Sequence, residues 1–469
     1  MRFAVCAIAK NEFNYINEWV AYQKIVGFDD IYIYDNNSND GTSELLINLD
    51  SKNIINRVFW PRLEGVAPQR AAYAHFLEKF SYKYDWVFIC DLDEFLIVDC
   101  QNVKKFVDLA ILKNSDVSAI AIPWLIFGAD EQVNYSPELV IERFKNCHSQ
   151  CDKRVKTLFR PDSVYQMRTH IVDLHKGVYL DNSFNAAEWS SKMPIDLSKS
   201  DKGYARVHHY FTKSYEEWIK RKSLPKADRT EIEFANIKIF NKYEKLESIN
   251  NDMDIYLLEV NQNKKILDQY SPIKSNFFNA EIIFSSETFL ILKITGLINK
   301  GVRVVLDDKY EIVTYNLILL DNGDYGLFLN LNIYSIKPTE INISSLDFLN
   351  QINIKKENYP SRNYALSSVL KYFKNAEYIK FNIFKRMIKD KNRFRICAET
   401  EFGDFVKFKE YGGIIHLQKK SYNKSLTKED ILNFLSNNGE SGKKAYLESL
   451  YGNKFFMENY DFFDELRLN

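Results

Sequence analysis

Two carboxylates separated by one residue, Asp91 and Asp93, follow directly on the apolar run Trp86–Cys90. A continuous apolar run of this length is typical of a strand that is covered on both faces of a sheet. In open α/β sheets, ligands bind beyond the carboxyl ends of the strands. Paired carboxylates at such a position suit Mg²⁺ or Mn²⁺, which commonly bridge to substrate phosphates. The spacing therefore indicates a metal–diphosphate site, although Asp-x-Asp also occurs in ordinary strand-ending turns.

Polar clusters also follow two earlier strand candidates. Residues Lys10–Glu12 come after the apolar run Phe3–Ala9, and residues Asp35–Thr42 come after Ile31–Tyr34. Asn, Asp, Ser and Gly are common turn formers, and turn formation accounts for much of the second cluster. Asp35 lies at the strand terminus itself, where its carboxylate could accept a hydrogen bond from a ribose hydroxyl or a base N–H. Three such clusters at one sheet edge predict a nucleotide-binding crevice.

The elements that must position these clusters alternate between strand and helix over about the first 110 residues. The patterns predict strands at Phe3–Ala9, Ile31–Tyr34, Val58–Trp60 and Trp86–Cys90, and helices at Glu12–Val26, Ser43–Leu49 and Arg70–Phe80. This alternation is typical of the α/β class, with a mostly parallel sheet flanked by helices on both faces. Right-handed crossovers then bring the strand ends to one edge.

Composition limits the possible classes of protein. A chain of 469 residues is too long for one ordinary core, so two or three domains are expected. Lys+Arg and Asp+Glu are both 63, so no net charge attracts nucleic acid, and no nucleic-acid partner is expected. Six cysteines are too few for a disulfide scaffold and point to a reducing compartment. Cys147, His148 and Cys151 form half a metal motif with no second half, so they are read as ordinary residues.

No targeting segment is recognised in the sequence. The apolar run Phe3–Ala9 is preceded by a single Arg and is interrupted too soon to be a signal peptide. No run reaches the roughly 18 apolar residues of a membrane span. The expected location is the cytoplasm.

A series of short motifs runs in order between residues 9 and 214. They are Ala9–Glu12, Glu18–Tyr22, Gly27–Asp29, Tyr34–Thr42, Asp85–Leu96, Trp124–Gly128, Lys156–Pro161 and His208–Ser214. In order and spacing these motifs resemble glycosyltransferase family 2-like and family 92 sequences, over about residues 1–225. The resemblance implies a GT-A fold, a nucleotide-sugar donor and a divalent cation, Mn²⁺ or Mg²⁺.

The resemblance also implies a metal set, Asp91, Asp93 and His209, with Asp93 the more direct ligand. A divalent cation there would act as a Lewis acid on the charge that develops on the β-phosphate. Imidazole coordinates Mn²⁺ acceptably. His209 is equally compatible with a pocket histidine that bonds a carbonyl group.

Other polar residues are candidates for donor binding. The set is Lys10, Asn11, Glu12, Asp35, Asn37, Arg70, Asp91, Lys156, Arg160 and Lys213. Lys156, Arg160 and Lys213 could reach the diphosphate as fixed cations; a solvated surface position is the alternative for each. Arg70 follows a Pro-containing turn at a helix start, where free N–H groups could bind phosphate or sugar oxygens. It could also be an ordinary exposed Arg.

A base is needed to deprotonate the acceptor hydroxyl, within hydrogen-bond reach of it. Asp130 and Glu131 are the best-placed acids, although family members often carry small polar residues at this point. Glu94 competes for the role but is expected to order the metal loop. Asp173 is a third candidate.

The sequence after residue 225 has a different residue pattern. We expect a GT-A domain over 1-270, a small β-rich domain over 276-348 and a mainly helical region over 349-469. The β-rich domain could bind carbohydrate or simply pack on the catalytic domain. Val369–Arg395 reads as a basic helix with an apolar stripe, which could lie on the inner membrane surface or pack on the protein. Thr427 and Asp430 resemble a capping box.

The sequence thus predicts a metal-dependent, inverting glycosyltransferase. It would move a sugar from a nucleotide-sugar, expected to be a UDP-sugar, to a glycan or glycolipid acceptor in surface polysaccharide or lipopolysaccharide synthesis. A catalytically silent glycan- or nucleotide-binding protein on the same fold is the alternative. A nucleotidyltransferase would want a Gly-rich basic loop near the N-terminus, which residues Ala7–Glu12 do not provide.

Overall fold

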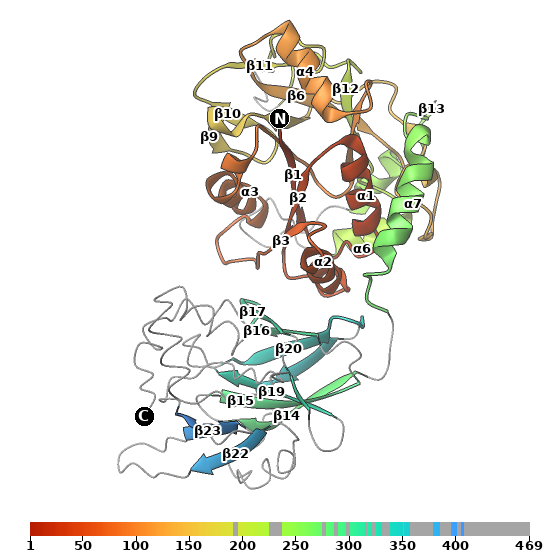
Figure 1. The fold of residues 1–469 in the computed structure, drawn as a ribbon. Coiled ribbons are helices and arrows are strands. Elements are labelled where there is room, and N and C mark those ends of the chain that lie inside the picture. The colour runs from red at the N-terminus through yellow and green to blue at the C-terminus, as the bar shows by residue number, and fades with distance from the viewer. Residues whose placement is uncertain are drawn as a thin grey trace. The chain divides into compact units, whose positions relative to one another are not determined.

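In the computed structural model, the chain forms two compact units, Met1–Ser271 and Pro272–Asn469 (Figure 1). The structure describes residues 1–190, 196–224, 237–273, 278–285, 289–296, 301–314, 317–319, 324–330, 338–349, 351–356, 379–384, 395–400 and 405–407. The division into domains 1-270, 276-348 and 349-469 stays a prediction.

A nine-stranded sheet forms the centre of the first unit. Its strands are β1 (Phe3–Ala9), β2 (Asp30–Asp35), β3 (Asn56–Phe59), β4 (Trp86–Ile89), β5 (Glu94–Val98), β6 (Val117–Ile126), β8 (Val155–Phe159), β11 (Val178–Leu180) and β12 (Ala205–His209). The strand order is β3-β2-β1-β4-β8-β6-β12-β5, and β11 pairs with β6. Strands β8 and β5 run antiparallel to their neighbours, and the others run parallel to one another. The predicted fold class, a mostly parallel sheet flanked by helices, is confirmed.

Helices cover both faces of this sheet. They are α1 (Ile16–Val26), α2 (Thr42–Ser51), α3 (Pro68–Lys79), α4 (Val103–Lys113), α5 (Val140–Arg143), α6 (Tyr215–Lys222) and α7 (Leu257–Asp268). Alternate side chains of a strand point to opposite faces. Phe3 and Val5 of β1 therefore join the core shared with α1, α2, α4 and α7, whereas Ala4 and Cys6 join the core shared with α3. Figure 1 shows α1 and α3 on opposite sides of β1.

Smaller elements complete the first unit. They are η1 (Ser81–Lys83), β7 (Asn146–Cys147), η2 (Pro161–Ser163), β9 (Val164–Met167), β10 (Val172–Leu174), η3 (Ile237–Lys242), β13 (Ser248–Ile249) and η4 (Asp254–Tyr256). Strand β9 pairs with β10, and β7 pairs with β13.

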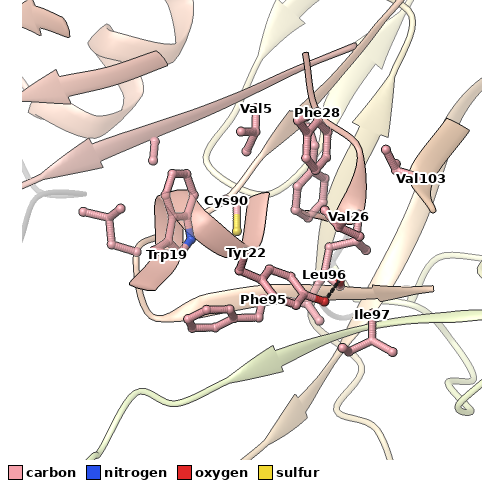
Figure 2. Packing of buried hydrophobic residues seen from close by; sticks show 14 of the residues in the cluster. Val5, Trp19, Tyr22, Val26, Phe28, Cys90, Phe95, Leu96, Ile97 and Val103 are labelled. Atoms are coloured by element: carbon pink, nitrogen blue, oxygen red, sulfur yellow. Dashed lines mark hydrogen bonds between the residues drawn. The ribbon is translucent and has the colours of Figure 1, made fainter. Parts of the chain in front are cut away.

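Helix α1 fixes the start of β5 through two buried hydrogen bonds. The Trp19 indole donates to the Glu94 carbonyl oxygen at 3.0 Å, and the Tyr22 hydroxyl donates to that of Leu96 at 2.6 Å. Figure 2 shows Trp19 and Tyr22 beside β5, and the Tyr22 ring meets the Phe95 ring edge to face, with 5.2 Å between the ring centres. Buried polar groups need such partners, so the two bonds set the position of β5 on α1. The backbone of Glu94 is therefore held from the interior of the protein.

The second unit is rich in β-structure. One sheet has the order β14-β15-β19-β18 and another has the order β17-β16-β20-β21. Their strands are β14 (Asn279–Ser285), β15 (Phe289–Thr295), β16 (Val302–Leu306), β17 (Tyr310–Thr314), β18 (Ile318–Leu319), β19 (Tyr325–Asn330), β20 (Glu340–Ser345) and β21 (Gln351–Lys355). The two sheets share one apolar core, which includes Leu292 and Val304. The predicted β-rich character of this region is confirmed.

The prediction of a basic helix over Val369–Arg395 is wrong for the part that the structure describes. Residues Ile379–Phe384 form strand β22, which pairs with β23 (Arg395–Thr400), and β23 pairs with β24 (Phe405–Lys407). The segment alternates Ile379, Phe381 and Ile383 with polar residues, a period of two that is typical of a strand. The remainder of that expected helix and the capping box at Thr427 lie outside the described residues. In the described part of the chain, none of the helices has the length and hydropathy to cross a bilayer.

Candidate active site

Strand direction gathers the polar residues at one edge of the nine-stranded sheet. The parallel strands β1, β2, β4, β6 and β12 all end there. Strands β8 and β5 run the other way, so their first residues lie at the same edge. Glu94 begins β5, His209 ends β12, and the two are directly paired in the ladder. Lys156, the second residue of β8, also lies toward this edge.

Asp93, Glu94 and His209 form a compact group that could hold a metal ion. One ligand atom from each lies within 4.8 Å of the others, and all three residues are buried. His209 Nε2 is 3.4 Å from Asp93 Oδ2 and 3.9 Å from Glu94 Oε1. Two carboxylates and an imidazole are a donor set that Mn²⁺ accepts.

Unpaired polar atoms in this group fit a cation. Glu94 Oε1 and His209 Nδ1 are buried and have no hydrogen-bond partner among the described residues. A buried carboxylate oxygen without a partner is costly. A divalent cation between Asp93, Glu94 and His209 would give that oxygen a partner, so the residues present fit the predicted metal.

Asp91, the other predicted metal ligand, points to different partners. Its carboxylate accepts hydrogen bonds from Lys156 Nζ at 2.9 Å, Gln69 Nε2 at 2.6 Å and the Tyr73 hydroxyl at 3.1 Å. Gln69 and Tyr73 lie on α3, and the sequence patterns did not single them out. A direct metal role for Asp91 stays a prediction, whereas Glu94 takes the place beside Asp93 and His209.

Lys156 neutralises the interior side of the cluster. Its completely buried ammonium group bridges Asp91 Oδ2 and Glu94 Oε2, the latter at 3.4 Å. Burial opposes the charge of Lys156, but Asp91 and Glu94 outweigh this effect and raise the pKa of its ammonium group. Burial also raises the pKa of Glu94 to about 8, despite the opposing effect of Lys156. Lys156 was predicted to bind the diphosphate; in the structure it binds the carboxylates.

Arg221 is a second cation at the cluster, and the sequence patterns missed it. It lies in the last turn of α6, and its Nη1 donates to Asp93 Oδ2 and to the Phe211 carbonyl oxygen, the latter at 2.9 Å. Although burial favours the neutral form of Asp93, Arg221 and His209 hold the pKa of that carboxyl well below its usual range. The basic run Lys220–Lys222 at the end of a helix was the signal that could have indicated it.

A pocket adjoins the cluster on the Arg221 side, with a volume of about 390 Å³. Its lining includes Lys10, Asn11, Glu12, Lys213 and Arg221. The structure thus brings four of the predicted donor-binding residues together, from the β1 end and from the segment after β12. The ammonium group of Lys213 lies 3.9 Å from the centre of the Tyr15 ring, and that of Lys10 donates to the Asn37 carbonyl oxygen. The pocket lining also contains Lys220 and the acids Glu12, Asp40 and Glu217, so cationic side chains are in slight excess.

Asp35 is placed differently from the ribose contact that its position suggested. Its side chain is completely buried, and Oδ2 pairs with Arg57 Nη2 at 2.6 Å. Oδ1 accepts hydrogen bonds from the Ser43 hydroxyl at 3.0 Å and from the Ser38 amide at 3.2 Å. Asp35 therefore fixes the loop after β2 and the start of α2, and a contact with the donor would require this network to open.

The two predicted arginines differ in their position relative to the cluster. Arg160 follows the carboxyl end of β8, and its amide bonds to the Ser118 carbonyl oxygen at the start of β6. Because β8 is antiparallel to β4 and β6, Lys156 and Arg160 lie toward opposite edges of the sheet. Arg70 is exposed on α3, next to Gln69, whose side chain bonds Asp91, so its contact with the donor stays a prediction.

The three other acids proposed as the base have local partners. Asp130 accepts hydrogen bonds from the amides of Lys145 at 2.7 Å and Asn146 at 3.2 Å. Glu131 is exposed, with an oxygen 3.3 Å from Lys245 Nζ. Asp173 pairs with Arg168 at 2.9 Å. A role for any of them as the base stays a prediction.

Comparison with known proteins gives a family match that lies in the first unit. The model of a family described as Glycosyltransferase family 92 matches residues 2–244, just over half of the 469 residues. A family 92 protein of Oryza sativa subsp. japonica is 26% identical over 169 residues, which cover 36% of this chain and 28% of that protein. One from Ricinus communis is 24% identical over 216 residues, 46% of this chain and 35% of that protein. The matched segment therefore spans about a third of these relatives.

Among solved structures, similar chains have low TM-scores. Staphylococcus aureus TarS matches with a TM-score of 0.27 and 12% identity, covering 92% of this chain and 98% of that chain. Glucosyl-3-phosphoglycerate synthase from Mycobacterium tuberculosis matches with a TM-score of 0.20 and 16% identity, covering 35% and 58%. Likeness at this level assigns neither a ligand nor a residue role to the present chain.

Proposed function

The chain belongs to glycosyltransferase family 92, and we propose that it transfers a sugar from a nucleotide-sugar to a hydroxyl of a glycan or glycolipid. The resemblance stated from the motifs is confirmed at the level of the family. The proposal rests above all on one observation: the buried group Asp93, Glu94 and His209 lies beside a pocket whose lining includes Lys10, Lys213 and Arg221. UDP is the proposed nucleotide.

A divalent cation, Mn²⁺ or Mg²⁺, is proposed as the cofactor. Asp93, Glu94 and His209 would hold it, and it would supply Lewis acid chemistry for a diphosphate leaving group. Lys156 holds Asp91 from the interior through a charge-assisted hydrogen bond and holds Glu94 through an ion pair at 3.4 Å. Lys10 and Lys213, at the pocket, are proposed to bind the donor.

The proposed reaction is a single inverting displacement. Asp130 and Glu131 follow β6 at the same sheet edge as the cluster, so we place the acceptor on that side. Replacing the base with a neutral residue should lower kcat and leave the donor affinity unchanged, because the base contacts the acceptor. Asp130→Asn and Glu131→Gln, compared in parallel, test the two acids. The proposed pathway is synthesis of a surface polysaccharide or lipopolysaccharide.

The central experiment presents the full chain with Mn²⁺ and a panel of UDP-, GDP- and CMP-sugars. Binding is measured by calorimetry, and release of the nucleotide product is measured with and without glycan acceptors. Turnover of one donor supports the transferase, and binding without turnover supports the silent binding protein instead. Absence of both across the panel refutes the proposal.

Asp93→Asn should abolish the metal-dependent part of donor binding, because it removes one of the proposed ligands. Asp162→Asn is the matched control, since the Asp162 side chain is 60% exposed and lies near the opposite sheet edge, after β8. Equal donor affinity in both variants would remove the metal role from Asp93.

A further inference from the structure

The cluster at the sheet edge contains three carboxylates and two resident cations. Asp91, Asp93 and Glu94 provide the carboxylates, and Lys156 and Arg221 provide the cations. The two cations contact different carboxylates: Lys156 bridges Asp91 and Glu94, and Arg221 contacts Asp93. A divalent ion that enters this group meets a guanidinium group already paired with one of its proposed ligands.

The two cations differ in their freedom to move. The side chain of Lys156 has no exposed surface and lies within the sheet, where leaving both carboxylates would strand a buried charge. The Arg221 side chain is 36% exposed and forms part of the pocket wall. Arg221 can therefore leave Asp93 and still keep its charge in contact with solvent and with the pocket.

The backbone that carries Arg221 is firmly held. Helix α6 begins with a capping box in which Ser214 and Glu217 each bond the other's backbone amide. Glu217 also pairs with Arg143 Nη2 at 2.6 Å, and both side chains are 4% exposed. The Tyr15 hydroxyl donates to the same carboxylate at 2.6 Å. A change at Arg221 is thus confined to its long side chain.

We infer that Arg221 is an exchangeable counter-ion of Asp93, which a divalent cation displaces, and that the released guanidinium group binds the diphosphate of the donor in the adjoining pocket. The pocket already holds Lys10 and Lys213, and a guanidinium group matches two phosphate oxygens at once. This inference rests on the proposed function for its second half, the contact with the donor. Its first half concerns the metal alone.

The two halves predict opposite changes in one variant. In Arg221→Gln, Mn²⁺ no longer competes with a guanidinium group for Asp93, so Mn²⁺ alone should bind more tightly. UDP in the presence of saturating Mn²⁺ should bind more weakly, because a charge-assisted contact is lost. We expect changes of about tenfold in each direction, in line with one hydrogen bond to a charged group.

The test titrates the full chain with Mn²⁺ alone, followed by electron paramagnetic resonance, and then titrates the Mn²⁺-loaded chain with UDP in a calorimeter. Lys222→Gln is the control, because it removes one positive charge from the next position of the same helix. Its ammonium group lies over the Trp218 ring, and Lys222 is not part of the pocket lining. It should leave both affinities near those of the unaltered chain. Arg221→Lys keeps the charge on a shorter side chain and should fall between Arg221→Gln and the unaltered chain.

Unchanged or weaker Mn²⁺ binding in Arg221→Gln overturns the counter-ion exchange, as does an equal rise in Lys222→Gln. If Arg221→Gln fails to fold, Arg221→Lys decides by the same comparison with Lys222→Gln. The Mn²⁺ titration needs no donor, so a failure of the proposed function is seen separately, as absent UDP binding in the unaltered chain.

Discussion

Replacing Lys156 with methionine removes the cation that bridges Asp91 and Glu94 and keeps a side chain of similar length. The Lys156 ammonium lies 2.9 Å from one carboxylate and 3.4 Å from the other, and the Lys156 and Glu94 side chains are completely buried. Removing one partner of a buried pair costs about 3–5 kcal/mol. The pKa of Glu94 is about 8, so this group is mostly protonated at pH 7. We therefore expect the lower end, a loss of about 3 kcal/mol in the free energy of unfolding.

The pH dependence of this loss has a definite sign. The pKa of folded Glu94 lies above the unfolded value of 4.5, so its protonation favours the folded state. This contribution is complete below the unfolded pKa and is lost as pH rises through about 8. Lys156 lowers the pKa of Glu94. In Lys156→Met this pKa is therefore higher than in the unaltered chain, and the stability of the variant continues to fall up to a higher pH. The difference in stability between the unaltered chain and Lys156→Met should therefore widen from about pH 6 to pH 9.

Urea denaturation in EDTA, followed by Trp fluorescence at pH 6 and pH 9, measures both quantities. The double variant Lys156→Met/Glu94→Gln removes the titrating group and should abolish the widening. Lys176→Met is the control, because the Lys176 side chain is 52% exposed and an exposed pair contributes about 1 kcal/mol at most. A Lys156→Met variant that is as stable as the control, or a difference that stays constant with pH, refutes the reasoning.

Three further predictions concern other parts of the first unit. Asp93→Asn should weaken Mn²⁺ binding at least tenfold while the circular dichroism spectrum stays unchanged, since it removes a proposed ligand and keeps the shape of the side chain; unchanged Mn²⁺ affinity would contradict the assignment. Asp35→Ala should lower the free energy of unfolding by about 3 kcal/mol, because it leaves the Arg57 side chain, 8% exposed, without the carboxylate it pairs with; a loss of UDP affinity without a loss of stability would favour the donor role instead. Burial raises the pKa of Glu18 to about 7, so the unaltered chain should lose stability relative to Glu18→Gln as pH rises from 5 to 8, by up to about 3 kcal/mol; parallel stability curves for the two chains would exclude this titration.

Much of the first unit was predictable because local patterns carry the information. The apolar runs of β1 and β4 could only be buried strands, and strand-helix alternation then fixed a mostly parallel sheet. The position of polar clusters after β1, β2 and β4 followed from that, and the structure places these ends at one edge. By contrast, the basic and apolar content around Ile379–Phe384 suggests a helix, whereas its period of two matches the strand that it forms.

The side-chain partners at the site could not be read in the same way. Asp35 looked like a ligand because it ends a strand, but Arg57 of β3 takes its carboxylate. Gln69 and Tyr73 bind Asp91 from α3, which lies on the other side of β1 from α1. Such partners depend on which helix packs on which face, and no local pattern encodes that.

The sequence by itself determined the family, the sheet and the Asp91 and Asp93 pair at a strand end, because these depend on residue types over short spans. Only the tertiary structure decided which of the acids stand together. The antiparallel direction of β5 and β8 brings Glu94 and Lys156 to the edge where His209 ends β12 and sends Arg160 to the other. The packing of α6 then sets Arg221 against Asp93. Strand direction and helix packing are settled by contacts between residues far apart in the chain, as for Arg221 and Asp93, 128 positions apart, and so they appear only in the folded chain.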